Sequence, residues 1–252
     1  MAKKISIHSF RGGTGKTNST ANIGALLALA GLRVAVLDSD IQSPGLHVLF
    51  DVDTDSDLLT LNDYIWGRCQ IQEAAHDVTA VLGASVEGKL FLIPSSIKAS
   101  ELARVLRDEN YDASRMNDAY DILIEKLNLD ALIIDTHPGL NDETLLSMAV
   151  SDVVGLLLRP DYQDYQGTSV ALEIAEKLDV PAIKLIVNKS PALFAPEIVK
   201  QKVGEAYEKE VAAVLPHSNE LMALASQAVF IIRYPNDPLT ALFKQVAVGL
   251  ME

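Results

Sequence analysis

Short runs of apolar, often β-branched residues recur along the chain, each followed by turn residues and then by a helical pattern. Apolar runs without polar alternation are typical of strands covered on both faces, and strands separated by helices favour a parallel sheet. The pattern therefore predicts an α/β sandwich, a mostly parallel β-sheet covered by helices on both faces. The runs begin at Lys4, Arg33, Lys89, Ala131, Val153, Ala182 and Val211.

The same pattern predicts where some elements begin and end. The first helix should begin near Lys16 and end at Gly31, a residue suited to a left-handed cap. Region 51–128 is harder to interpret, with helical segments around LNDYIW and ELARVL. The last segment, 237–252, has an apolar stripe and a single lysine, which favours a helix docked on the core over one lying on a membrane.

Composition narrows the class of protein. The chain has 252 residues, 49% of them hydrophobic, and we expect a single domain spanning 1–252. Cys69 is the one cysteine, which excludes an internal disulfide or a cysteine-ligated cluster held by one chain. The sequence offers no signal peptide and no run as long as a membrane span, so we expect a cytoplasmic protein. The net charge of −13 opposes nucleic-acid binding unless basic side chains gather locally.

The stretch SFRGGTGKTNST, residues 9–20, carries the clearest chemistry. A strand that enters a glycine-rich turn and then a helix presents backbone N–H groups to phosphate. Lys16 would reach the β- and γ-phosphates, and the Thr17 hydroxyl would ligate Mg²⁺. Phe10 occupies the first glycine of the strict G-x-x-x-x-G-K-[ST] pattern, yet GGTGKT at a strand-to-helix junction still predicts a phosphate loop. The predicted nucleotide-binding positions here are Gly12, Gly13, Thr14, Gly15, Lys16, Thr17 and Asn18.

With these residues in place, the chain resembles the deviant-Walker ATPases of the ParA/MinD family, whose loop reads K-G-G-x-G-K-[ST]. VAVLDSDIQSPGL looks like the family's second aspartate motif, and ALIIDTHPGLNDET looks like its Walker B strand and second switch. LIVNKSP and VAAVLPHSNEL are similar to its two base-binding segments. The resemblance covers nearly the whole chain and is weakest over 51–128. It implies a P-loop NTPase that binds ATP and Mg²⁺ and hydrolyses ATP slowly, with stimulation by a partner.

The resemblance implies roles for three aspartates. Asp40 would position or polarise the attacking water, Asp38 would lie near the magnesium shell, and Asp135 would hold a magnesium-bound water. Carboxylates at strand ends facing a phosphate loop suit both tasks, and a carboxylate that closes a buried strand needs a cation or several donors. The alternative for Asp38 and Asp40 is that they only cap the following turn.

The base is predicted to be adenine. NKSP resembles the N-K-x-D box of GTPases, but Pro191 stands where that box has the aspartate that reads guanine. The amide of Asn188 can pair with the donor and acceptor of adenine. Pro216 would lie beside the base, by the resemblance, or is an ordinary loop proline.

His137 stands where relatives often have proline or a small residue. A pH sensor or a partner contact is conceivable there, but we interpret it as an ordinary loop histidine. The histidines show no H-x-x-H or H-E-x-x-H spacing, so we expect no metal site held by the protein alone.

Family members form ATP-dependent homodimers that localise cargo on a surface, and an adaptor protein stimulates their hydrolysis. The absence of a basic tail favours nucleoid DNA over the membrane used by MinD-like members, although His217 and Ser218 replace the arginine that often contacts DNA. The basic candidates, which are otherwise scattered solvated charge, are Lys200, Lys202, Lys209, Arg233 and Lys244.

The leading hypothesis is therefore a positioning or partitioning ATPase, cytoplasmic and nucleoid-associated, with the carboxysome-distribution branch as a narrower placement. An ATP-gated regulator with negligible turnover, a MinD-like membrane-associated ATPase and a biosynthetic phosphoryl-transfer enzyme are the alternatives.

Arg11 occupies the position of the family's signature lysine, which reaches across the dimer to the partner's phosphates. Arginine keeps the charge and adds a planar fork of donors, so it could make the same contact and act catalytically in trans. The alternative is a solvent-facing or intrachain salt-bridge role.

Overall fold

The fold is built on one mixed sheet. The computed structural model describes residues 2–54, 57–84, 86–105 and 115–252. Within these residues the sheet has eight strands in the order β3-β4-β2-β5-β1-β6-β7-β8, and every pairing is parallel except that of β3 with β4. The predicted mostly parallel sheet is confirmed. The strands are β1 (Lys3–His8), β2 (Arg33–Asp38), β3 (His76–Asp77), β4 (Lys89–Ile93), β5 (Ala131–Asp135), β6 (Val153–Leu158), β7 (Ala182–Ser190) and β8 (Glu210–Pro216).

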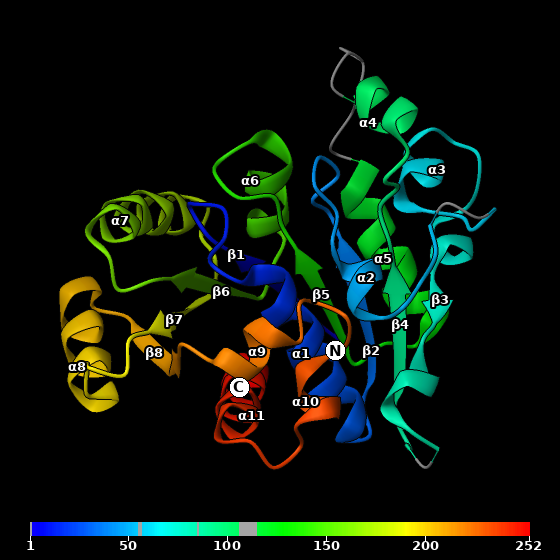
Figure 1. Ribbon diagram of the computed structural model, residues 1–252. Coiled ribbons are helices and arrows are strands. Elements are labelled where there is room, and N and C mark those ends of the chain that lie inside the picture. The colour runs from blue at the N-terminus through cyan, green and yellow to red at the C-terminus, as the bar shows by residue number, and fades with distance from the viewer. Residues whose placement is uncertain (1, 55–56, 85, 106–114) are drawn as a thin grey trace.

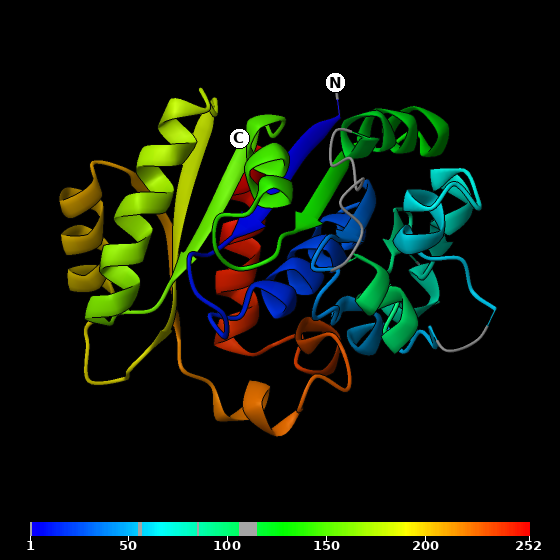
Figure 2. The ribbon, with the colours of Figure 1, turned by 90° about the horizontal axis from the view of Figure 1, so that it is seen from above.

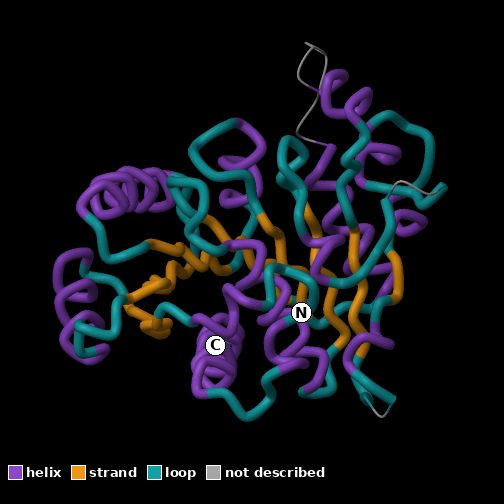
Figure 3. Tube along the Cα trace, in the orientation of Figure 1, coloured by secondary structure: helices purple, strands orange, loops and turns teal. Residues whose placement is uncertain are grey.

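Helices cover both faces of this sheet, as predicted (Figure 3). The α-helices are α1 (Lys16–Leu29), α2 (Leu46–Leu49), α3 (Leu61–Ile65), α4 (Ala99–Val105), α5 (Arg115–Leu127), α6 (Asp142–Ala149), α7 (Tyr162–Lys177), α8 (Pro196–Tyr207), α9 (Asn219–Ala223), α10 (Phe230–Arg233) and α11 (Pro238–Met251). Two short 3₁₀ helices in the described residues are η1 (Ile71–Ala74) and η2 (Thr79–Leu82).

Apolar cores lie on both faces of the sheet. On one face, α1 and α11 pack against each other and against the sheet, while α10 contacts α1. On the other face, α5 contacts β5, α6 contacts β1, α7 contacts β6 and α8 contacts β7 and β8. Figure 1 shows α6 and α7 on the side of the sheet opposite α10 and α11. The apolar runs of the strands are buried because helices cover them on both faces.

Helix α1 lies very close to the sheet. A Cβ built on Gly24 would fall 2.5 Å from Val36 Cγ1, so glycine is needed for this approach. The helix ends where predicted, since Gly31 has a φ of +94° just after the C-cap residue Ala30. The C-cap residue Ala30 is exposed.

Region 51–128 departs most from the sequence pattern. Helices α3 and α4 form where LNDYIW and ELARVL predict them, but the pattern did not predict the antiparallel edge strand β3 or helix α5. Helix α5 buries Met116, Ala119, Tyr120 and Leu123, a spacing of three, one and three residues that is typical of an amphipathic helix.

The final helix packs on the core. Helix α11 contacts β8 and α1, and its apolar stripe of Leu239, Phe243, Val246 and Leu250 is buried. The prediction of a core-docked last helix is confirmed. Among the described residues, no helix has the length and apolar character that crossing a membrane requires.

Candidate functional site

A glycine-rich loop joins β1 to α1 at the end of the sheet opposite both termini (Figure 2). Gly13 and Gly15 have φ of +76° and +102°, conformations that favour glycine. A Cβ on Gly12 would lie 3.8 Å from Pro138, so the loop also touches the segment that follows β5. The first turn of α1 therefore presents free backbone N–H groups at the rim of this loop.

The loop lines a cavity of about 330 Å³. Its walls come from the loop, from the segments after β2 and β5, and from the end of β7. The lining residues are Gly12, Gly13, Gly15, Lys16, Thr17, Asn18, Asp40, Ser43, Pro138 and Lys189. Most of the predicted nucleotide-binding positions of the loop thus face one cavity; Thr14 is not among its lining residues and is buried.

Lys16 is the buried cation of this site, with 6% of its surface exposed. Burial lowers the pKa of its ammonium group, while the nearby Asp135, Asp40 and Asp38 raise it. The field of three carboxylates therefore opposes the loss of its proton.

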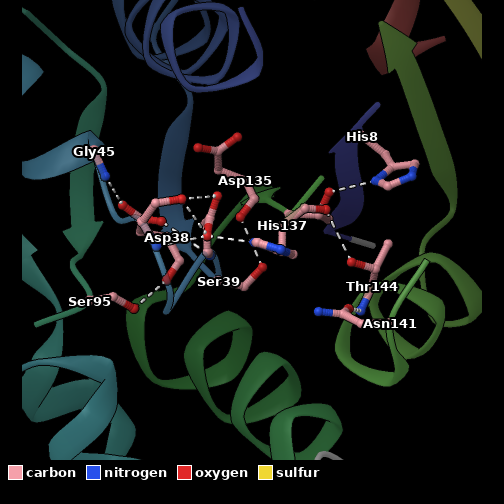
Figure 4. Close-up of polar contacts among 12 residues, drawn as sticks. His8, Asp38, Ser39, Gly45, Ser95, Asp135, His137, Asn141 and Thr144 are labelled. Carbon is pink, nitrogen blue, oxygen red and sulfur yellow. Dashed lines mark hydrogen bonds and ion pairs between the residues drawn. The ribbon is translucent and has the colours of Figure 1, made fainter. Parts of the chain in front are cut away.

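Asp38 and Asp135 end neighbouring strands and face each other in register (Figure 4). Asp38 accepts hydrogen bonds from the backbone N–H groups of Gly45 at 2.9 Å and Leu46 at 3.0 Å. Burial and then the charge of Asp135 raise the pKa of Asp38 well above its usual range, against these two bonds. The carboxylate of Asp38 thus ties down the segment after β2, as well as lying beside Asp135.

Asp135 has the chemistry of a magnesium-shell residue. Its Oδ1 accepts from the Thr20 hydroxyl at 3.2 Å, and its buried Oδ2 has no partner among the described residues. Burial raises its pKa to about 6, while Lys16 opposes this shift. An unpartnered buried carboxylate oxygen beside a second carboxylate fits a hard cation or its bound water. In the described ranges, no group of three or more His, Cys, Asp or Glu side chains could hold a metal ion.

Asp40 lies on the cavity wall and is held by two residues. Its Oδ1 accepts from the Ser43 backbone N–H at 3.0 Å and from His137 Nδ1 at 2.8 Å. The Ser43 hydroxyl lies 3.2 Å from both carboxylate oxygens. His137, interpreted from the sequence as an ordinary loop histidine, therefore has its ring on the predicted catalytic carboxylate.

Asn188 and Lys189 bind the phosphate loop from the end of β7. Asn188 Nδ2 donates to Thr14 O at 2.8 Å, and its Oδ1 accepts from Lys189 N at 2.8 Å. Lys189 Nζ donates to Gly13 O at 2.8 Å, a contact that the sequence pattern did not single out. A Cβ on Gly15 would lie 2.5 Å from Asn188 Nδ2, so this glycine is required beneath the amide. Asn188 thus supports the loop, and its role toward a base stays a prediction.

Pro216 ends β8, pairs with Ser190 of β7, and is half-buried. Asn188 lies two residues before the end of β7, so Pro216 and Asn188 lie at the same carboxyl edge of the sheet. Its proximity to a bound base stays a prediction.

Arg11 points away from the cavity walls toward the start of α7. Its Nη1 donates to Gln163 Oε1 at 2.5 Å and lies 3.6 Å from Asp164 and 4.0 Å from Asp161. Asp164 is buried, which would raise its pKa, but the hydrogen bonds and charge of Arg159, bonded at 2.8 Å, and then the charge of Arg11 lower it. Within a single chain Arg11 thus takes the intrachain arrangement, and its predicted trans contact would require it to leave Gln163.

His8 is a buried neighbour of the site that the sequence pattern gave no reason to select. It ends β1 with no exposed surface, and its Nδ1 lies 2.9 Å from the Thr136 hydroxyl. The Thr136 hydroxyl donates to Ile7 O at 3.0 Å, so it accepts from His8 Nδ1–H. Nε2 has no partner in the described part of the chain, and burial lowers the pKa of His8 to about 3.

The predicted basic candidates do not share one element. Lys200 and Lys202 lie on α8, Arg233 ends α10, and Lys244 lies on α11. Lys209 is engaged in an ion pair with Glu176 at 2.6 Å. Two of the candidates thus share α8, and a single basic face made of all five stays a prediction.

A phosphate loop at the carboxyl end of a central parallel strand, faced by aspartates from the next two strands of the sheet, defines a P-loop NTPase site. A family model described as an AAA domain (AAA_31) matches residues 2–184. The chain belongs to this family and, within it, to the ParA/MinD-type P-loop ATPases, with Arg11 in place of the signature lysine.

Individual relatives span nearly the whole chain. The chain is 27% identical to an uncharacterized ATP-binding protein of Methanocaldococcus jannaschii, covering 100% of this chain and 88% of that one. It is 28% identical to the chromosome-partitioning ATPase Soj of Treponema pallidum, covering 93% and 90%. The septum site-determining protein MinD of Pyrococcus horikoshii, solved with Mg-ADP, matches with a TM-score of 0.79 at 20% identity, covering 99% and 96%.

Proposed function

We propose that this protein is an ATP-binding and ATP-hydrolysing dimerisation switch that positions or partitions intracellular cargo. Its family acts in partitioning or positioning, and the name of the Soj relative and the Mg-ADP in the MinD structure point the same way. The proposal rests above all on one cavity of about 330 Å³, which is lined by the glycine-rich loop, by Lys16 and by Asp40.

The residues divide the work of hydrolysis among them. The loop N–H groups and Lys16 bind the phosphates, and Thr17, Asp38 and Asp135 hold Mg²⁺ directly or through water. Mg²⁺ would neutralise the charge that develops on the phosphate oxygens. Asp40 accepts a hydrogen bond from the attacking water and orients it, while Asn188 and Pro216 face the adenine.

Arg11 supplies the link to dimerisation. Its side chain is 41% exposed and contacts Gln163 and Asp164, and Asp164 is already paired with Arg159. Exchange of these contacts for a partner's phosphates is a small rearrangement at the surface. Arg11 would then complete the partner's site in the manner of an arginine finger.

Dimerisation is tested first. The oligomeric state of the Asp40→Ala variant, in which ATP should persist, is measured by sedimentation under three conditions. These are ATP with Mg²⁺, ADP with Mg²⁺, and no nucleotide. We expect a dimer with ATP and a monomer in the other two cases. A monomer under all three conditions would contradict the proposed ATP-dependent dimerisation.

The surface on which the dimer acts is proposed to be nucleoid DNA, with an adaptor protein that resets it. Support comes from Lys200 and Lys202, which both lie on α8 and which a dimer would present twice. DNA should be retained in the presence of ATP and released as salt rises, because counterion release dominates such binding. Absence of binding at low salt, together with ATP-dependent binding to anionic vesicles, would favour the membrane instead. The carboxysome-distribution branch stays a narrower hypothesis about cargo.

A further inference from the structure

We infer that His137 is a positioning residue for ATP hydrolysis: its Nδ1–H fixes the orientation of the Asp40 carboxylate and couples it to the loop after β5. The inference rests on the proposed ATPase function and adds to it a residue that the comparisons do not assign.

The contact between the two side chains is short and directional. His137 Nδ1 lies 2.8 Å from Asp40 Oδ1, and the side chains are 22% and 11% exposed. A carboxylate accepts hydrogen bonds and does not donate them, so Nδ1 carries the proton in this contact. A hydrogen bond to a charged acceptor at a partly buried position is stronger than one between neutral groups.

Because of this contact, the two carboxylate oxygens of Asp40 have different hydrogen-bond partners. Oδ1 accepts from His137 Nδ1 and from the Ser43 backbone N–H, whereas Oδ2 has the Ser43 hydroxyl at 3.2 Å as its one partner in the described residues. An ionised carboxylate has about four lone-pair sites. Oδ2 therefore keeps the capacity to accept from a water molecule, and rotation of the group about Cβ–Cγ would break the His137 contact.

His137 is itself anchored from the other side (Figure 4). The Thr144 hydroxyl of α6 donates to His137 O at 3.2 Å. Thr144 N in turn donates to Asn141 Oδ1 at 2.9 Å, the N-cap contact that begins α6. Pro138, the next residue along the chain, lines the cavity beside Gly12. A shift of the loop after β5, which would face the γ-phosphate, is thus transmitted to Asp40 through one imidazole.

The Ser43 contacts cannot replace this link. Ser43 lies three residues after Asp40 on the same segment, so its bonds hold the carboxylate to its own loop. His137 is separated from Asp40 by 97 positions and joins two different strand ends, β2 and β5. Its bond reaches the Asp40 carboxylate directly from the loop after β5.

The test compares two substitutions that differ in one donor. His137→Ala removes the Nδ1–H, whereas His137→Asn places an amide Nδ2–H at the same distance from the backbone. We measure kcat, KM for ATP with Mg²⁺, direct ATP affinity and the unfolding midpoint of each. His76→Asn, at the far edge strand β3, is the matched control.

His137→Ala should lower kcat about 10- to 100-fold, the range for loss of one hydrogen bond to a charged group, while KM and ATP affinity stay within about 2-fold. His137→Asn should recover kcat to within about 5-fold of the unsubstituted protein, and His76→Asn should match it. If His137→Ala does not fold, His137→Leu fills similar volume without a donor and replaces it in the comparison.

Two results would overturn the inference alone: an unchanged kcat in His137→Ala, or a kcat in His137→Asn as low as that of His137→Ala. The latter would mean that the imidazole acts by its bulk. If the unsubstituted protein hydrolyses ATP no faster than Asp40→Ala, the proposed function fails, and the inference fails with it.

Discussion

Replacement of His8 by asparagine should change how the stability of the protein depends on pH. The imidazole is fully buried, donates from Nδ1 to Thr136, and has Nε2 without a partner among the described residues. Protonation would bury an N–H with no acceptor near the positive Lys16, and burial with this charge lowers the pKa of His8 to about 3. In the unfolded chain the same ring has its ordinary pKa of 6.5.

The magnitude follows from linkage. Because the folded-state pKa is depressed, the unfolded state alone binds this proton between pH 6.5 and pH 3, so stability is present above pH 6.5 and is lost as pH falls. Between pH 7 and pH 5 the free energy of unfolding should decrease by about 2 kcal/mol from His8 alone.

Urea denaturation of the nucleotide-free protein at intervals from pH 7 to pH 5 measures this effect. The His8→Asn variant should lose about 2 kcal/mol less than the unsubstituted protein over that interval, whatever its absolute stability. His217→Asn, which changes an exposed histidine, controls for the loss of one imidazole. If His8→Asn and the unsubstituted protein show parallel pH curves, His8 is not the buried neutral group that the fold indicates.

Three further substitutions test the packing and charge around the loop. Gly167→Ala would place a Cβ 2.2 Å from the Phe10 ring, so we expect urea denaturation to show a loss of about 1–3 kcal/mol and disturbance of the phosphate loop; unchanged stability would contradict the close packing of α7. Asp164→Asn removes the charge that pairs with Arg159 and should cost about 1.5–3 kcal/mol by the same assay, and a neutral effect would refute this pair's role. Arg11→Ala should change monomer stability by less than about 1 kcal/mol, because its contacts are partly exposed, but should abolish ATP-dependent dimerisation in sedimentation; a normal dimer would eliminate the trans contact.

Local sequence signals predicted the parts of the fold that local physics determines. The strand-to-helix junction at Lys16, the left-handed position at Gly31 and the docked stripe of α11 depend on neighbouring residues along the chain. Helix α5 was not predicted, although its buried positions follow a helical spacing. Short helices and strands alternate in region 51–128, so no single hydrophobic periodicity extends along it.

The contacts that set the chemistry of the site could not be predicted from spacing. His137 reaches Asp40 across 97 positions, and His8 reaches Thr136 across 128. Both pairs arise because parallel strands bring their carboxyl ends to one edge of the sheet. This rule predicts which segments meet there, but it does not predict which side chains contact each other. The same holds for Arg11, whose contact with Gln163 depends on where α7 begins.

Hydrolysis of ATP through Asp40 is measured by phosphate release. Steady-state release is measured for the unsubstituted protein and for Asp40→Ala, each with Mg²⁺, with and without DNA. We expect slow release by the unsubstituted protein and none above background by Asp40→Ala, with ATP still bound by both. Equal rates for the two proteins would contradict hydrolysis through Asp40 and would favour a nucleotide-gated regulator without turnover.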